Sequence, residues 1–481
     1  MRRHFLTLFT GTTLSALLLG ATVALSQAEP APPHSTASTP APAKATAAAR
    51  NAKMQQAVER LVETIDRYGG TVGVHVMDIA TGEQLATHAA SKPFNPASNM
   101  KVLTAAAALW KLGPNHKYRT ALYGRRSGSS VGNLVLRSYG DPSLETKDLW
   151  ELSGGLNRWG IQRVKGDILV DQSYFDDRYV PPGFEQQPHE WAYFRAPVSA
   201  VALDANTLTM HVAPTRSGER ALVTFAPAGF VDLRGRVRTG SAGSAQNVTL
   251  RLEASGQRLN ARVGGAIPED SSRLRVTKRV ADPTLFAGYA LRAILTRQGI
   301  EVTGKVKAGG SKARHRLTLH NSAPLAKLLY RLGKDSDNFY AEMIFKSLNG
   351  GKERQGLSSE SGAEVVRTYL KAINAETKGV DIRNGSGLFD TNRLTPRLLT
   401  TVLSAAYKDE SMRPEFVSHL AVGGQDGTLQ RRFRDKRSRG RVRAKTGTLA
   451  AVAALSGYVM RSGSDAPRPQ QRRVCDAGTQ M

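Results

Sequence analysis

The middle of this chain has a different secondary-structure pattern from its two ends, and this contrast limits the folds that the chain can adopt. Strand-like runs separated by Gly, Ser, Asp and Pro dominate residues 116–305. Helical patterns frame this block on both sides, and a pair of strand patterns closes the chain near residues 439–460. We predict an α/β (α+β) fold: one domain of helices on an antiparallel sheet, built from 52–115 and 306–460, interrupted by inserted β-rich domains at 116–305.

Composition narrows the class of protein further. Cys475 is the one cysteine among 481 residues, which excludes a disulfide scaffold, a zinc ribbon and a cysteine-ligated iron–sulfur cluster. No internal apolar run approaches the ~18 residues of a membrane span, which excludes a multi-span membrane protein. The 67 Lys and Arg residues against 40 Asp and Glu give a net charge of +27. That charge favours anionic partners such as nucleic acid, anionic lipid or an acidic polymer, and it is equally compatible with a basic protein that has none.

The N-terminus predicts export. Arg2 and Arg3 precede a mostly apolar stretch that is densest over Leu14–Leu25, and small residues suited to cleavage follow it. This pattern indicates a secretory signal peptide over 1–28, with an uncleaved membrane anchor as the alternative. We therefore expect the protein in the periplasm or cell-wall space, where nucleic acid is not its main partner. Residues 29–50, rich in Pro, Ala and Thr, are expected to form a disordered linker.

Three short motifs follow one another in a fixed order. They are Ser98-Asn99-Met100-Lys101, Ser336-Asp337-Asn338 and Lys445-Thr446-Gly447-Thr448. Each motif alone is weak, because each occurs often by chance. Together and in this order they form the signature of serine penicillin-binding proteins and class A β-lactamases.

The first motif has the parts of an activated nucleophile. Ser98 and Lys101 are three residues apart at a predicted helix start, so they share a face. A serine hydroxyl needs an adjacent base, and a lysine serves if its pKa is lowered by burial or by a nearby cation such as Lys445. The Ser98 N–H at the helix N-terminus is a candidate oxyanion donor. Alternatively, Ser98 is a simple N-cap.

The other two motifs would handle the substrate. Ser336 can pass a proton to a leaving amine, and Asn338 can donate to and accept from a substrate amide. Lys445 can hold a carboxylate, assisted by hydrogen bonds from Thr446 or Thr448, while Gly447 lets the backbone approach closely. The Thr448 N–H is a candidate second oxyanion donor. The alternatives are a capped helix-to-helix turn and a solvated basic strand, since Arg and Lys crowd residues 431–443.

One further pattern matches a nucleophile motif but lacks the structural setting that the motif needs. Residues 128–132 match G-x-S-x-G, but a nucleophile elbow needs a strand before it and a helix after it. Here the surroundings predict a hairpin loop. The ten histidines form no H-E-x-x-H, no metal site is visible, and we expect no cofactor.

With these motifs the sequence resembles the D-alanyl-D-alanine carboxypeptidase/endopeptidase family, the class C low-molecular-mass penicillin-binding proteins. The spacing carries the resemblance, because a long insertion between the first two motifs is typical of that family. Further matches are Tyr139–Pro142, Ala196–Ala200, Asn384–Leu388 and Gly424–Leu429. The resemblance runs from about residue 52 to 460.

The resemblance implies a hydrolase of the bacterial cell wall. Ser98, activated by Lys101, would attack peptidoglycan stem peptides after the penultimate D-alanine, and β-lactams would acylate it as substrate mimics. An anionic wall polymer is a further possible partner, and the membrane enters only if the signal segment is uncleaved. A serine β-lactamase and a non-catalytic, cationic wall-binding protein remain as alternatives.

The chain departs from the family in two places. Relatives often carry an acidic residue before the Ala-Pro-Val-Ser stretch that contacts the amine of the stem peptide, and the role cannot be assigned to Glu190. After Met460 the family continues with an apolar strand and a helix, whereas residues 461–481 show neither pattern. We expect a disordered tail there, and a sheet without its last strand and covering helix.

Overall fold

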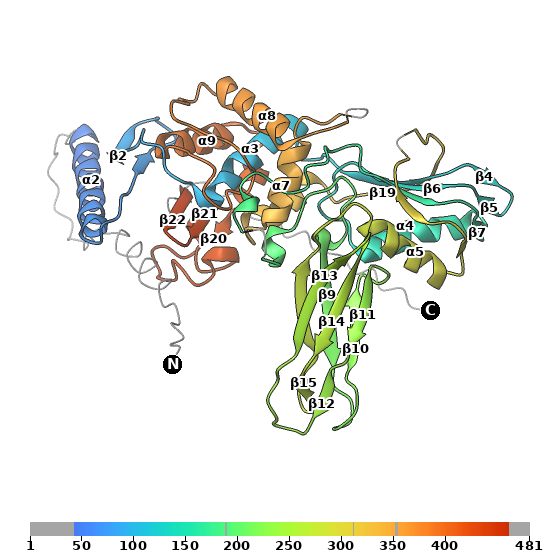
Figure 1. Ribbon diagram of the computed structural model, residues 1–481. Helices are drawn as coiled ribbons and strands as arrows, with labels where there is room; N and C mark the ends of the chain where they lie inside the picture. The colour runs from blue at the N-terminus through green and yellow to red at the C-terminus, as the bar shows by residue number, and fades with distance from the viewer. Residues whose placement is uncertain (1–42, 188–189, 311, 352–354, 461–481) are drawn as a thin grey trace, which may run out of the picture.

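In the computed structural model, the chain forms a helical part and an inserted part that lie side by side (Figure 1). Residues 43–187, 190–310, 312–351 and 355–460 are described. The predicted signal segment and C-terminal tail lie outside these ranges. Within them, none of the helices has the length and apolar character needed to cross a membrane.

The helical part contains both ends of the described chain. Its helices are α2 (Ala43–Arg67), α3 (Met100–Leu112), α6 (Leu325–Gly333), α7 (Asn338–Ser347), α8 (Ser359–Ala372), α9 (Pro396–Lys408) and α10 (Arg413–His419), with short 3₁₀ turns η1 (Ala97–Asn99) and η5 (Gly427–Leu429). Its strands are β1 (Val74–Met77), β2 (Gln84–His88), β20 (Ala421–Val422), β21 (Val442–Leu449) and β22 (Val452–Val459).

Helix α3 lies at the centre of this part. Its Ala-rich sequence has high helix propensity, and Ala105–Ala108 are completely buried among α6, α7, α8 and α9. Small side chains let these helices approach from several sides. The antiparallel sheet β20–β21–β22 packs on η1 at the start of α3. The helix start that carries the first motif is therefore held between the helical core and the sheet.

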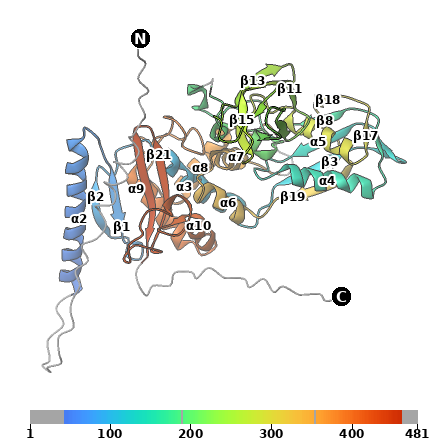
Figure 2. The same cartoon turned by 90° about the horizontal axis from the view of Figure 1, so that it is seen from below.

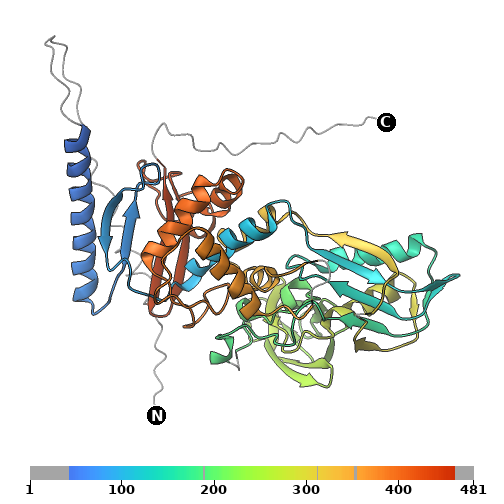
Figure 3. The same cartoon turned by 90° about the horizontal axis from the view of Figure 1, so that it is seen from above.

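The hairpin β1–β2 forms a separate two-stranded sheet. Helix α9 packs against both β1 and β22 and so connects the two sheets. Figure 2 shows α2 covering β1 and β2 at the outer side, and Figure 3 shows the insertion at the opposite end. Strand β22 has a partner on one side only within the described residues.

The prediction of a disordered linker over 29–50 is wrong at the C-terminal end of that segment. Helix α2 begins at Ala43, whereas 29–50 was expected to be disordered throughout. The last proline of the stretch is Pro42, and five of the next eight residues are alanine. Alanine is the strongest helix former, so the helix extends back to the proline.

The inserted part divides into two. One half has a five-stranded sheet, β18–β8–β6–β3–β19, a four-stranded sheet, β17–β7–β5–β4, and helices α4 and α5. The other half, strands β9–β16, projects away from the rest of the molecule (Figure 1). The first half comprises β3 (Arg119–Tyr123), β4 (Arg126–Ser127), β5 (Ser130–Val131), β6 (Leu134–Ser138), α4 (Thr146–Arg158), β7 (Arg163–Val164), β8 (Ile168–Asp171), α5 (Phe286–Arg297), β17 (Glu301–Val302), β18 (Val306–Ala308) and β19 (Arg316–Asn321).

The projecting half and the segment leading to it are mostly short strands and 3₁₀ turns. They comprise η2 (Phe184–Gln186), η3 (Tyr193–Arg195), η4 (Asp204–Asn206), β9 (Thr207–Ala213), β10 (Leu222–Ala226), β11 (Val231–Gly235), β12 (Arg238–Gly240), β13 (Thr249–Ser255), β14 (Arg258–Gly264), β15 (Ala266–Pro268) and β16 (Leu274–Arg279). Alternating burial in β9 and β14 gives this half its own small core.

The insertion ends later than the predicted boundary at residue 305. Strand β19 pairs antiparallel with β3, the first strand of the insertion, so the chain leaves and re-enters the helical part at neighbouring positions. Helix α4 also lies in the block predicted to be β-rich. The G-x-S-x-G stretch forms the hairpin β4–β5, as expected from the sequence.

Candidate active site

The three motifs come together at the N-terminal end of α3. Lys101 is completely buried, and its Nζ lies 3.0 Å from Ser98 Oγ, 2.8 Å from Asn338 Oδ1 and 2.8 Å from the Ser386 carbonyl oxygen. Lys445 Nζ donates to Ser336 Oγ at 2.8 Å. Hydrogen-bonded partners up to 285 positions apart therefore meet here, and the charge of Lys101 also acts on Lys445.

The surroundings of Lys101 determine how its amine acts. Two of its three neighbours, the oxygens of Asn338 and Ser386, are acceptors only, whereas a serine hydroxyl both donates and accepts. A neutral amine has two N–H groups and one lone pair. If the two N–H groups serve the two carbonyl-type oxygens, the lone pair faces the Ser98 hydroxyl. The arrangement suits a base that removes the Ser98 proton.

Burial allows the Lys101 amine to be uncharged near pH 7. It lowers the pKa of Lys101 to about 7, against the opposing charges of Glu342 and Asp337. Burial also holds the pKa of Lys445 well below its usual value, and the nearby Lys101 charge lowers it further. The sequence argument assigned the lowering at Lys101 partly to Lys445, but in the structure burial is its principal cause.

The Asn338 amide is oriented by the insertion. Its Nδ2 donates to the Phe194 carbonyl oxygen in η3 at 3.0 Å, which leaves Oδ1 to accept from Lys101. We expected Asn338 to meet a substrate amide, whereas here both of its ends already have partners. Glu190, whose role could not be assigned from sequence, pairs with Arg195 at 3.2 Å.

The turn between α6 and α7 has the polar character expected of the second motif. Asp337 caps α7 by accepting from the Tyr340 N–H, and Ser336 adopts a left-handed backbone with φ of 59°. Such a conformation is uncommon for residues other than glycine and is typical of functional sites. It presents the Ser336 hydroxyl to Lys445.

Strand β21 approaches η1 closely. A Cβ at Gly447 would lie 2.9 Å from the Pro96 carbonyl oxygen and 3.1 Å from the Ser98 N. Glycine at 447 therefore lets the strand lie against the nucleophile, as the sequence suggested. Thr446 is half-buried and donates to Thr428 Oγ1 at 2.9 Å, and Thr448 is exposed. Thr428 belongs to the Gly424–Leu429 stretch, for which sequence reasoning gave no role.

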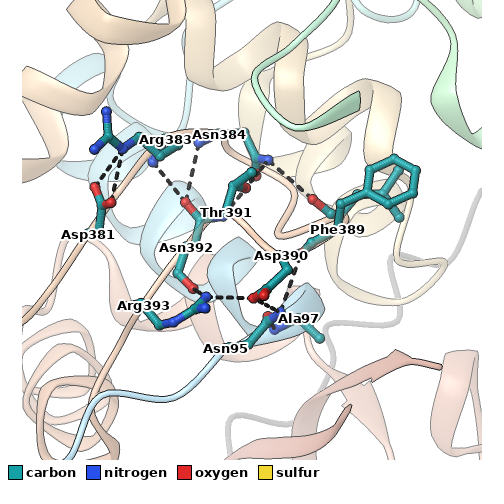
Figure 4. A network of polar contacts seen from close by, with 11 residues as sticks. Asn95, Ala97, Asp381, Arg383, Asn384, Phe389, Asp390, Thr391, Asn392 and Arg393 are labelled. Carbon is teal, nitrogen blue, oxygen red and sulfur yellow. Dashed lines mark hydrogen bonds and ion pairs between the residues drawn. The ribbon is translucent and has the colours of Figure 1, made fainter. Parts of the chain in front are cut away.

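A network of amides and carboxylates fixes the turn before Ser98 (Figure 4). Asn95 Oδ1 accepts from the Ala97 N–H at 2.8 Å, and its Nδ2 donates to Asp390 at 2.9 Å. Asn384 and Asn392 join the two sides of the 384–392 loop through a 2.8 Å hydrogen bond. This loop carries Ser386, so the network places both the nucleophile and a partner of its base.

Comparison with known proteins identifies the group to which this arrangement belongs. The model of the D-Ala-D-Ala carboxypeptidase 3 (S13) family matches residues 54–466. A D-alanyl-D-alanine carboxypeptidase of Actinomadura sp. (strain R39) is 32% identical over 432 residues, covering 85% of this chain and 79% of the relative. The D-alanyl-D-alanine carboxypeptidase DacB of Haemophilus influenzae is 26% identical over 398 residues, covering 81% of this chain and 82% of the relative.

Solved structures agree with these relatives. Penicillin binding protein 4 (dacB) from Haemophilus influenzae has a TM-score of 0.69 at 26% identity, covering 81% of this chain and 87% of that one. Its complex with a novel β-lactam has a TM-score of 0.65, again at 26% identity, covering 81% of this chain and 86% of that one. The predicted fold class and the resemblance noted from the motifs are confirmed. This chain belongs to the D-Ala-D-Ala carboxypeptidase 3 (S13) family.

Proposed function

We propose that this protein is a serine-type D-alanyl-D-alanine carboxypeptidase/endopeptidase that acts on peptidoglycan stem peptides through an acyl-enzyme on Ser98. The observation that carries the proposal is the 3.0 Å contact between Ser98 Oγ and a buried Lys101 whose other two neighbours are acceptors. Family membership supports the same reaction class.

Acylation uses the parts in sequence. Ser98 Oγ attacks the carbonyl carbon of the penultimate D-alanine while Lys101 Nζ takes the hydroxyl proton. The N–H groups of Ser98 and Thr448 are the proposed donors to the oxyanion. The C–N bond then breaks, and the leaving amine gains a proton through Ser336. In the endopeptidase reaction, a cross-linking amine leaves in place of D-alanine.

Hydrolysis reverses these roles. Water attacks the ester, Lys101 accepts its proton, and Ser98 recovers a proton as the D-alanyl product leaves. Lys445 is the proposed partner of the terminal carboxylate, with Thr446 beside it. An incoming carboxylate compensates the burial of Lys445, because an opposite charge favours the ammonium form. No metal or organic cofactor has a part in this scheme.

The test uses the wild-type protein with two substrates. We expect release of D-alanine from a peptide ending in D-Ala-D-Ala, and a fluorescent penicillin adduct that peptide mapping places on Ser98. A folded protein that does neither would be a non-catalytic wall-binding relative. Rapid penicillin turnover without D-alanine release would indicate a serine β-lactamase.

The pH dependence of acylation follows from the state of Lys101. Its amine must be neutral to accept the Ser98 proton, and the pKa of Lys101 is lowered to about 7. The acylation rate constant should therefore rise about tenfold per pH unit below 7 and level off above it. Stopped-flow acylation by a penicillin between pH 5 and 9 measures this. A rate constant that still rises tenfold per pH unit up to pH 9 would mean that Lys101 keeps the pKa of an exposed lysine.

We also propose export to the periplasm or cell-wall space and attraction to an anionic wall polymer. The segment 431–441 supports the second point, because it exposes six cations beside the loop that reaches Thr446: Arg431, Arg434, Lys436, Arg437, Arg439 and Arg441. Its one acid, Asp435, is engaged with Ser438 and the Arg437 N–H.

Binding to wall sacculi should therefore depend on salt. We expect cosedimentation with sacculi to fall several-fold between 50 and 500 mM NaCl, because screening shortens the reach of exposed charges. The variant Arg434→Glu/Arg437→Glu should weaken binding at 50 mM NaCl while leaving penicillin acylation intact. Equal binding by both proteins at all salt concentrations would contradict this surface.

A further inference from the structure

Glu342 is a buried carboxylate next to the site, and it has no part in the mechanism above. It lies one helical turn after Asn338 on α7, so the two side chains share a face. Its side chain is 2% exposed. Oε1 accepts from the Ser386 N–H at 2.8 Å and Oε2 from the Gly385 N–H at 3.1 Å. Both oxygens therefore act as acceptors, as an ionised carboxylate does. Burial raises the pKa of Glu342, while the hydrogen bonds from Gly385 and Ser386 and the charge of Lys101 oppose that rise and favour the carboxylate.

The peptide that Glu342 holds is wedged between α7 and η1. A Cβ at Gly385 would lie 2.4 Å from Phe345 Cβ, and a Cβ at Gly387 would lie 1.8 Å from the Ala97 carbonyl oxygen. Gly387 also has a φ of 75°, which side chains rarely adopt. The two glycines allow the loop to fit into this narrow space, with Ser386 between them.

From this position the loop acts on the base. The Ser386 carbonyl oxygen is 2.8 Å from Lys101 Nζ and is one of the two acceptors that direct the amine. Its neighbours along the backbone are the two N–H groups bound by Glu342. A movement of that peptide would therefore move an acceptor of Lys101.

We propose that Glu342 is a positioning residue for Lys101: its carboxylate fixes the backbone of Gly385 and Ser386, whose Ser386 carbonyl group directs the amine, and its charge balances the ammonium formed when Lys101 takes the Ser98 proton. The inference rests on the proposed function, since it assigns Lys101 the role of base. It gives the second helical turn of α7 a part in the reaction.

The charges around Lys101 agree with this role. Glu342 in α7 and Asp337, which caps α7, raise the pKa of Lys101 against the lowering by burial. From β21, the Lys445 amine also lies near Lys101, but burial holds the pKa of Lys445 well below its usual value and so favours its neutral form. Lys346, one turn beyond Glu342, is 2.9 Å from the Arg178 carbonyl oxygen and also pairs with Asp176. Of the two acids, Glu342 has the larger effect on the pKa of Lys101.

The test compares two substitutions that separate charge from shape. Glu342→Gln keeps the length of the side chain and removes its charge, so the ammonium form of Lys101 loses support. We expect the rising limb of penicillin acylation to move about one pH unit lower than in wild type. The plateau rate should fall about tenfold, because a weaker base is less effective and one N–H loses its acceptor.

Glu342→Asp keeps the charge and serves as the conservative variant. Its plateau can fall because a shorter side chain reaches the loop poorly, but its rising limb should stay at the wild-type pH. Asp171→Asn, which removes a buried carboxylate paired with Arg137 in the insertion, is the matched control for loss of a buried charge and should leave the limb unmoved. Thermal unfolding identifies any variant that fails to fold.

The outcomes are distinguishable. Folded Glu342→Gln with a lower plateau and an unmoved limb would reduce Glu342 to a structural anchor and overturn the inference. If Glu342→Gln fails to fold, Glu342→Asn is compared with Glu342→Asp, which has the same length and keeps the charge: a limb at lower pH in Glu342→Asn supports the inference, and equal limbs contradict it. Absence of acylation in the wild type would instead refute the proposed function.

Discussion

Replacing Ser98 with alanine is expected to abolish the penicillin adduct and lower D-alanine release by at least about 10⁴-fold. The substitution removes the one oxygen that Lys101 can deprotonate, while Asn338 and Ser386 still satisfy the amine. Because Ser98 is only half-buried, the free energy of unfolding should change by no more than about 1 kcal/mol. Gel fluorescence, D-alanine assay and chemical denaturation measure the three effects.

Ser130→Ala is the matched control. Ser130 is the central serine of the G-x-S-x-G stretch and lies in the hairpin β4–β5 of the insertion. This variant should label like wild type. Retained labelling in Ser98→Ala together with loss in Ser130→Ala would place the nucleophile in the insertion and refute the site.

Replacing Lys101 with methionine should lower the acylation rate constant by about 10³- to 10⁴-fold. Methionine has a similar length and fills the buried space without an amine. The Ser98 hydroxyl remains but loses its base, and two acceptor oxygens lose their donor. Penicillin labelling over hours, compared with seconds in the wild type, measures the loss.

The same variant has a stability signature that a surface lysine would not give. Since the pKa of Lys101 is near 7 when folded and near 10 when unfolded, the unfolded chain binds more protons between these values. The wild-type free energy of unfolding should therefore rise with pH between 7 and 9, relative to Lys101→Met, by roughly 1 kcal/mol per pH unit. The control is Lys111→Met, on the exposed end of α3, which should show neither effect. A parallel pH dependence in wild type and Lys101→Met would show that Lys101 is not buried as a neutral amine.

The side chains of the site could be predicted because the motifs are recognised from the types of their residues and the order in which they follow one another. Lys101 contacts Ser98, and Lys445 contacts Ser336 although the two lie 109 residues apart in the sequence. The acceptors that direct the base could not be found this way. The Ser386 and Phe194 carbonyl groups belong to the backbone, which every residue has, so only the path of the chain distinguishes them.

Glu342 shows a related limit. On sequence it is one acidic residue in a helix, where a solvated position is the usual outcome. Its proximity to the second motif and its place four residues after Asn338 were the available signals. What distinguishes it is the pair of N–H groups from Gly385 and Ser386, and these come from a loop more than forty residues away.

The insertion was recognised from its succession of strand-like patterns, but its end was predicted too early in the sequence. Strand β19 is only six residues long and follows a Gly- and Lys-rich stretch, so local pattern gave it little weight. Its membership of the insertion depends on pairing with β3, nearly two hundred residues earlier. Long-range pairing of this kind is not encoded in any short window.

The long stretch of sequence between α3 and the elements that surround it in the fold also affects how this protein folds. Helix α3 is made well before its partners, because its contacts come from α6–α9 and its nucleophile packs against β21, all beyond residue 320. Until those segments exist, a strongly apolar helix has no place to bury its side chains. Closing loops of two to three hundred residues makes this half of the molecule a slow, late-forming unit, whereas the insertion is complete in sequence by Asn321 and can fold earlier. A chain interrupted during synthesis before β21 would therefore expose the Ala-rich face of α3 to aggregation, beside an insertion that is already folded.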